Sequence, residues 1–164
     1  MKISTLFFAA SLCLALQACG GSREEKTQDA PPATNGPYTQ EQLQLQDSLW
    51  TDIMAVHDSV MPKTSDITKL SQRFKQELKE NKKLDNATKS QLITVLEFLE
   101  QSDASMFDWM NNLKQIHKLR EVNMPHNEIV TYLLQEKTAI VKVRDAMLTS
   151  LEAGNQLVEQ HNMK

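Results

Sequence analysis

Five residues in this sequence combine soft-metal ligand side chains with a spacing that could bring them together. One histidine and two methionines recur at spacings of three and four, which would place them on one face of a helix. Two more methionines stand four positions apart later in the chain. The five residues are Met54, His57, Met61, Met106 and Met110. Thioether sulfur with imidazole nitrogen is a ligand set that suits Cu(I) or a haem iron.

The same spacing is also typical of the core of a helical bundle, where methionine fills irregular gaps well. If the first two helices form a hairpin turning near residue 84, His57 would lie level with the stretch from Met110 to Leu113, and the four methionines would share its layer. Core packing is the interpretation we favour, so we expect no cofactor, with copper or haem as the alternative. The sequence has no Cys-x-x-Cys-His, which excludes covalent c-type haem.

Two charged residues, Asp103 and Lys137, fall on helix faces that are otherwise apolar. A buried charge is costly unless it is paired. If the chain turns between residues 120 and 124, the two side chains would lie within about one helical turn of each other. We expect a buried or half-buried pair that fixes the register of two helices, as single polar residues do in coiled coils.

No motif for catalysis is present. The sequence has no Gly-x-Ser-x-Gly, no His-Glu-x-x-His and no glycine-rich phosphate loop. It also has no Glu-x-x-His pair of the kind that builds a di-iron site. Carboxylates stand beside lysines, as in Lys79-Glu80 and Glu136-Lys137, which is typical of a solvated helix face. We expect a protein that is not an enzyme.

Cys19 indicates where the protein resides. It ends the run Leu16-Gln17-Ala18-Cys19, which resembles the lipobox of bacterial lipoproteins, and it follows a basic start and the apolar stretch 3–16. This is the layout of a secretory signal, and the apolar stretch is shorter than the roughly 20 residues of a membrane-spanning helix. The resemblance implies cleavage before Cys19, a diacylglyceryl group on its sulfur and an acyl group on its new amine.

These features divide the chain into a signal peptide (1–18), a lipidated cysteine with a flexible linker (19–37) and a helical body (38–164). The linker holds three of the four glycines and three of the five prolines, a composition typical of an extended tether. Gly20, rather than an aspartate, follows Cys19 and favours the outer membrane. We expect an outer-membrane lipoprotein that faces the periplasm or the cell surface.

The body has no basic stripe, and the net charge of the chain is −3. Nucleic acid is therefore not expected as a partner. The lipid on Cys19 would hold the protein to the membrane, and a protein partner or a homo-oligomer is expected beyond it. Cys13 leaves with the signal peptide and Cys19 carries lipid, so no thiol remains for a disulfide or a thiolate metal site.

Apolar residues in the body recur at three and four positions, which predicts an all-α fold. Thr39 with Gln42 fits a capping box at the first helix, and Asp85 or Asn86 caps the second, which continues to His117. The third helix runs over 126–160, with Gly154 as a weak point. These three helices predict an antiparallel bundle.

Pro62 leaves the first helix with two interpretations. Proline removes one hydrogen bond and crowds the preceding turn, so it either kinks one long helix or ends it. The apolar pattern continues from Trp50 to Leu78 without a slip, and this favours one helix kinked at Pro62. The alternative is a four-helix bundle.

Two segments, His57-Asp58-Ser59-Val60-Met61-Pro62-Lys63 and Met106-Phe107-Asp108-Trp109-Met110, resemble an uncharacterised family of small helical bacterial lipoproteins. Its pattern is His-Asp-x-x-Met-Pro followed by Met-x-x-Trp-Met, and some members are mislabelled viral A-type inclusion protein. The resemblance covers most of the body. It implies a helical fold and an envelope location but no activity, and it draws attention to Trp109 beside the histidine and methionines.

We therefore expect a lipid-anchored protein of the cell envelope with a non-enzymatic interaction or structural role. The alternative is a periplasmic or surface protein that binds copper or haem through the histidine and methionines named above.

Overall fold

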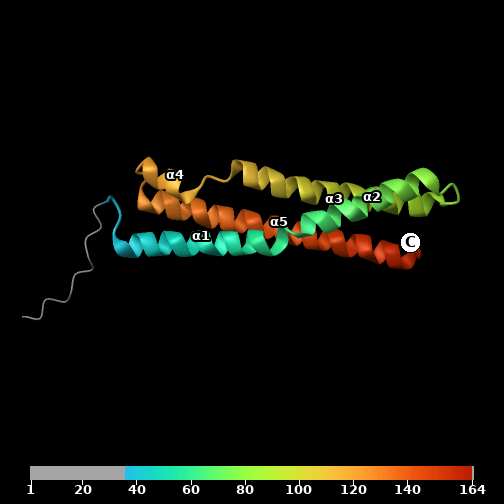
Figure 1. Ribbon diagram of the computed structural model, residues 1–164, viewed down its shortest axis with the longest axis horizontal. Helices are drawn as coiled ribbons and strands as arrows, with labels where there is room; N and C mark the ends of the chain where they lie inside the picture. The colour runs from blue at the N-terminus through green and yellow to red at the C-terminus, as the bar shows by residue number, and fades with distance from the viewer. Residues whose placement is uncertain (1–35, 164) are drawn as a thin grey trace, which may run out of the picture. The chain divides into compact units, whose positions relative to one another are not determined.

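The structure, a computed structural model, describes residues 36–163, and all regular secondary structure in this range is helical. The helices, shown in Figure 1, are α1 (Gln40–Val60), α2 (Lys63–Glu80), α3 (Asn86–Asn112), α4 (Ile116–Glu121) and α5 (His126–Gln160). The expected all-α class is confirmed. The expected signal peptide (1–18), Cys19 and nearly all of the linker lie outside the described residues.

The longest helix, α5, contacts α1, α2 and α3, and α2 also contacts α3. Side-chain pairs give the directions of these helices. Gln46 and Asp52 of α1 meet His126 and Lys137 of α5 in the same order, so α1 and α5 run in the same direction. The buried hydroxyls of Ser102 on α3 and Ser150 on α5 are 2.8 Å apart. The connections place α3 in the opposite direction (Figure 1), which is consistent with a three-helix bundle.

Pro62 separates α1 from α2, yet the backbone between them stays in the right-handed helical region. Met61 has φ −52° and ψ −39°, and Pro62 has φ −61° and ψ −19°. The amide of Met61 still donates to the His57 carbonyl at 2.8 Å, and the amide of Thr64 donates to Met61 in a tighter turn at 3.2 Å. Two helices therefore replace the expected single kinked helix, but the winding between them is not lost.

Buried apolar residues recur every seven positions along the long helices, the repeat of helices that pack knobs into holes. They are Ile53, Val60, Ile67 and Phe74 on α1 and α2, Leu92, Leu99 and Met106 on α3, and Leu133, Ile140 and Met147 on α5, each no more than 1% exposed. Each fully buried Leu or Ile contributes about 1.5–3 kcal/mol. The repeat passes through Pro62 because the backbone there remains helical.

The helix ends agree in part with the sequence. The predicted capping box of Thr39 and Gln42 is present, and Asp85 accepts a hydrogen bond from the Thr88 amide at 2.9 Å. The prediction that the second helix continues to His117 was wrong. α3 ends at Asn112, Leu113 is extended with ψ 118°, and a separate short helix, α4, follows. None of the helices within 36–163 combines the length and the apolar character that crossing a bilayer requires.

Candidate functional site

His57 and Met110 meet at the contact between α1 and α3. His57 lies in the last turn of α1, and its side chain is 16% exposed. Its Nε2 atom is 3.3 Å from the sulfur of Met110 near the end of α3. The sequence predicted that these residues would lie level with each other, and the structure brings them into contact.

Asp58 holds the other nitrogen of the His57 ring. Its carboxylate oxygen lies 2.8 Å from His57 Nδ1. An ionised carboxylate only accepts hydrogen bonds, so Nδ1 must be the donor. In the neutral imidazole, Nε2 then carries the lone pair, and this lone pair faces the sulfur of Met110. A carboxylate that orients a histidine in this way is also a common arrangement behind metal ligands.

Trp109 lies beside the contact of His57 with Met110. Its ring centroid is 5.8 Å from that of His57, with the two planes tilted by 33°. The side chain is buried, and its indole nitrogen has no hydrogen-bond partner within residues 36–163. The sequence signal for Trp109 was its place in the segment that resembles the lipoprotein family.

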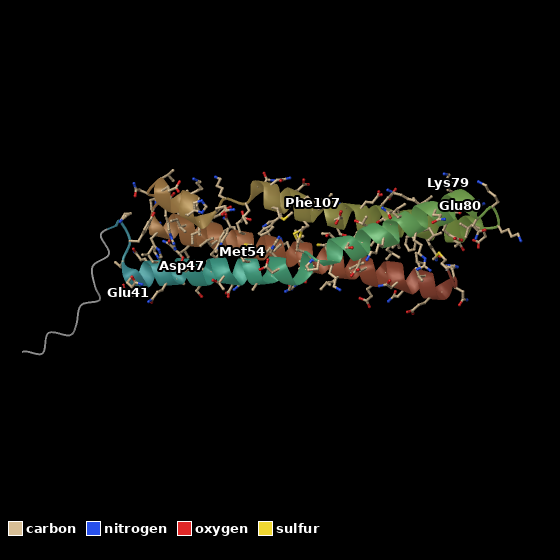
Figure 2. All side chains as sticks on the ribbon, in the orientation of Figure 1. Glu41, Asp47, Met54, Lys79, Glu80 and Phe107 are labelled. Atoms are coloured by element: carbon tan, nitrogen blue, oxygen red, sulfur yellow. The ribbon has the colours of Figure 1, made fainter. Side chains whose placement is uncertain are left out.

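The other methionines lie around this contact. Met106 is fully buried one turn before Met110, and Met61 is partly buried against the core one turn after His57. Met54 is partly buried one turn before His57. In Figure 2, methionine sulfurs, drawn in yellow, lie in the region between the labels of Met54 on α1 and Phe107 on α3. No group of three or more His, Cys, Asp or Glu within 36–163 is placed to hold a metal ion.

The expected pair of Asp103 and Lys137 does not form. Lys137 contacts Asp52 of α1 instead, at 2.7 Å. Ser102 faces Ser150, so Asp103 lies several turns of α5 away from Lys137. The expectation was wrong because it assumed a tight hairpin near residue 122, whereas α3 ends early and α4 lengthens the connection.

Asp103 instead faces α2. It lines a small pocket together with Ser71 and with Lys75 and Glu100, which form an ion pair at 2.5 Å. One carboxylate oxygen of Asp103 and the hydroxyl of Ser71 are buried, and neither has a hydrogen-bond partner in the described part of the chain. Burial raises the pKa of Asp103 above its ordinary value of 3.8.

Asp103→Asn is therefore expected to stabilise the protein at neutral pH. Because the pKa of Asp103 is raised by folding, the stability falls as the pH rises through 3.8 and through the folded pKa. An asparagine side chain keeps the size without the charge, so the free energy of unfolding should rise by about 1 kcal/mol or less, because the residue is only half-buried.

Urea unfolding at pH 7 and at pH 3 measures this effect, which should vanish at the lower pH. Asp108→Asn is the matched control, because Asp108 is an exposed aspartate on the same helix. Equal stability of Asp103→Asn and the unchanged protein at pH 7 would contradict the expectation.

A polar network that the sequence analysis missed ties α1 to α4 and α5. Gln46 is fully buried, accepts a hydrogen bond from Arg120 Nε at 2.7 Å, and its amide nitrogen lies 3.0 Å from His126 Nδ1. Arg120 also pairs with Asp47 at 2.6 Å. Nearby, the hydroxyl of Tyr38 donates to the carbonyl of Met124 at 2.7 Å. The available signal was position: Gln46 stands seven residues before the buried Ile53.

A second surface feature lies between α2 and α5. We name it the α2–α5 groove, an open groove of about 760 Å³ between residues 63–73 and residues 148–159. Its apolar part consists of Leu70, Leu148 and Leu151, of which Leu148 is 45% exposed. Charged side chains line both edges.

The chain matches no protein-family model, no curated protein and no solved structure. The resemblance of the segments 57–63 and 106–110 to the helical lipoprotein family therefore stays a prediction.

Proposed function

We propose that this protein is a lipid-anchored module of the bacterial cell envelope that acts by binding a protein chain and not by catalysis. The sequence ending at Cys19 supports the anchor and an outer-membrane location. The contacts of α5 support an antiparallel three-helix bundle in which α1 and α2 together form the first arm. The observation that carries the binding role is the α2–α5 groove.

The groove combines apolar and charged side chains in the manner of an interface. Leu148 exposes nearly half of its surface beside the more buried Leu70 and Leu151. A large apolar side chain rimmed by polar residues is typical of a surface that another protein covers.

The charges at the edges of the groove favour a second copy of this chain as the partner. Lys63, Asp66, Lys69 and Arg73 line the α2 edge, where Asp66 pairs with Lys63 and the other two leave the edge basic, whereas Glu152 and Glu159 line the α5 edge. None of the ion pairs formed between residues 36 and 163 involves Lys69 or either glutamate. In a symmetric dimer the same patch meets itself.

A twofold axis parallel to the helices would place the basic edge of one copy opposite the acidic edge of the other. Both copies would then begin at the same end of the dimer. Two lipid anchors could reach one membrane from that end, which fits the proposed location.

Leu148→Glu is expected to dissociate this dimer. The substitution replaces the exposed leucine of the groove with a carboxylate that the partner would have to bury. Loss of a central interface side chain costs at least about 2 kcal/mol of binding free energy, so the dimer should weaken roughly 30-fold or more. Light scattering of purified residues 22–164 over a range of concentrations measures the mass. Ile93→Glu is the matched control, because Ile93 on α3 is 47% exposed and lies outside the groove.

Charge reversal gives a second measurement of the same interface. Lys69→Glu should weaken the dimer, and the double variant Lys69→Glu with Glu152→Lys should recover part of the loss. A wild-type chain that stays monomeric at high concentration, or an equal loss in Ile93→Glu and Leu148→Glu, would contradict the second copy as the partner.

A further inference from the structure

The contact of His57 with Met110 sets two electron-pair donors against each other. Because Asp58 accepts the proton of Nδ1, the neutral ring directs the lone pair of Nε2 at Met110. A thioether sulfur has no hydrogen to donate and can only accept. Such a contact becomes favourable when a cation, either a proton or a metal ion, lies between the two atoms.

The separation of the two atoms fits ligands that share one metal ion. With metal–nitrogen and metal–sulfur bonds of about 2.0–2.1 Å and 2.3 Å, a nitrogen and a sulfur 3.3 Å apart subtend an angle of about 100° at the metal. This angle lies near that of tetrahedral coordination. Axial ligands of a haem iron lie on opposite sides of the metal, so the same bond lengths would separate them by about 4.3 Å. The geometry therefore favours a single ion over haem.

The surrounding residues favour a soft, singly charged ion. Thioether sulfur selects Cu(I) over hard divalent ions. Met61, the residue that follows α1, lies one turn beyond His57 and packs against the core, which makes its thioether a candidate for a further ligand. Trp109, with its ring centroid 5.8 Å from that of His57, adds an aromatic wall of the kind that attracts cations.

We propose that His57 Nε2, Met110 Sδ and the thioether of Met61 form a binding site for Cu(I), which Ag(I) also occupies. Asp58 orients the histidine, and Trp109 covers the ion. This inference goes beyond the proposed protein-binding role and is independent of the α2–α5 groove, because His57, Met61 and Met110 lie where the end of α1 meets α3 and do not line the groove.

Silver is the probe of choice because it is soft, monovalent and does not change oxidation state during the measurement. Purified residues 22–164 are titrated with Ag(I) by calorimetry, and the complex is weighed by native mass spectrometry. We expect one tightly bound ion per chain. We also expect the fluorescence of the protein to change on binding, and this change to be largely lost in Trp109→Phe.

Met110→Leu is the decisive variant, because leucine keeps the volume and the apolar contacts of methionine and should leave the fold intact. We expect its affinity for Ag(I) to fall at least tenfold. Met147→Leu is the matched control, since Met147 is fully buried on α5 and belongs to the core repeat. Its affinity should equal that of the unchanged protein.

Asp58→Asn tests the orienting role, and loss of such a partner typically costs 10–100-fold in metal affinity. His57→Ala should abolish binding. Failure of the unchanged protein to bind one Ag(I), or equal affinities of Met110→Leu and Met147→Leu, would overturn the site. Neither result affects the dimer, whose mass is measured separately.

Discussion

Gly154→Val is expected to lower the free energy of unfolding by about 2 kcal/mol, as overpacking of a well-filled core does. Gly154 is buried on α5 at the repeat position that follows Leu133, Ile140 and Met147. A Cβ at this site would overlap Leu70 Cδ2, and it would lie 3.2 Å from Leu70 Cγ and 3.5 Å from Leu99 Cδ1.

The position of Leu70 on α2 therefore depends on the absence of a side chain here, whereas Leu99 on α3 would only come into van der Waals contact. Replacing glycine with alanine in a helix interior contributes about 0.5–1 kcal/mol in the opposite direction, and valine contributes less because its helix propensity is lower. A β-branched side chain has few rotamers with which to avoid the overlap. The overlap therefore dominates, and the side chain of Leu70 has to leave its place in the core.

Urea unfolding of residues 22–164 measures the change. Ala153→Val, at the preceding and half-exposed position, is the matched control and should alter stability by less than about 1 kcal/mol, since only helix propensity is lost. Gly154→Ala should lie between the two, because a displaced Leu70 can accept one methyl group. If Gly154→Val matched the unchanged protein, close packing at this position would be disproved.

Cys19→Ala is expected to move nearly all of the protein from the membrane fraction to the soluble fraction. In the proposed lipoprotein, the thiol of Cys19 accepts the lipid, and stable anchoring requires more than one acyl chain. Alanine offers no sulfur, so both the lipid and the cleavage before residue 19 should be lost. Membrane fractionation with detergent-phase partition measures the change, and the intact mass reports the retained signal peptide.

Cys13→Ala provides the matched control, because Cys13 is the other cysteine of the chain and lies within the expected signal peptide. This variant should be lipidated and anchored as before. A Cys19→Ala protein that remained in the membrane and partitioned into detergent would refute the lipid anchor.

Periodicity predicted the helices well because it reports local burial. Thr39 and Asp85 cap the helices that the sequence assigned to them, since a cap depends on residues three positions away. The break at Asn112 was missed because Ile116 and Leu119 continue to look like a helix face. They are buried, but on the separate helix α4.

For the candidate site, too, the contacts that follow from local pattern were predicted and those that depend on distant parts of the chain were not. His57 and Met110 could be predicted to meet, because the register of the two helices follows from one turn near residue 84. The partner of Lys137 could not, because it depends on a connection whose length the sequence does not show. Gln46 was overlooked because a polar residue at a buried position is explained by its partners Arg120 and His126, which are both distant in the chain.

Gly154 was expected to be a weak point because glycine lowers helix propensity. In the structure, Gly154 instead favours the packing of the bundle, because the missing side chain permits close approach of α2. Intrinsic propensity describes a helix in isolation and does not report what packs against it.

The Gln46 network also has a mechanical consequence. Any pull on the chain at residue 36 reaches Tyr38 first, and its hydrogen bond to Met124 fastens the start of the body to the turn before α5. The next contact along the chain is that of Arg120, which donates hydrogen bonds to Gln46 and Asp47 in the first two turns of α1. A force that pulls on the proposed anchor would therefore be transmitted to α4 and α5 through these hydrogen bonds before it could unwind α1.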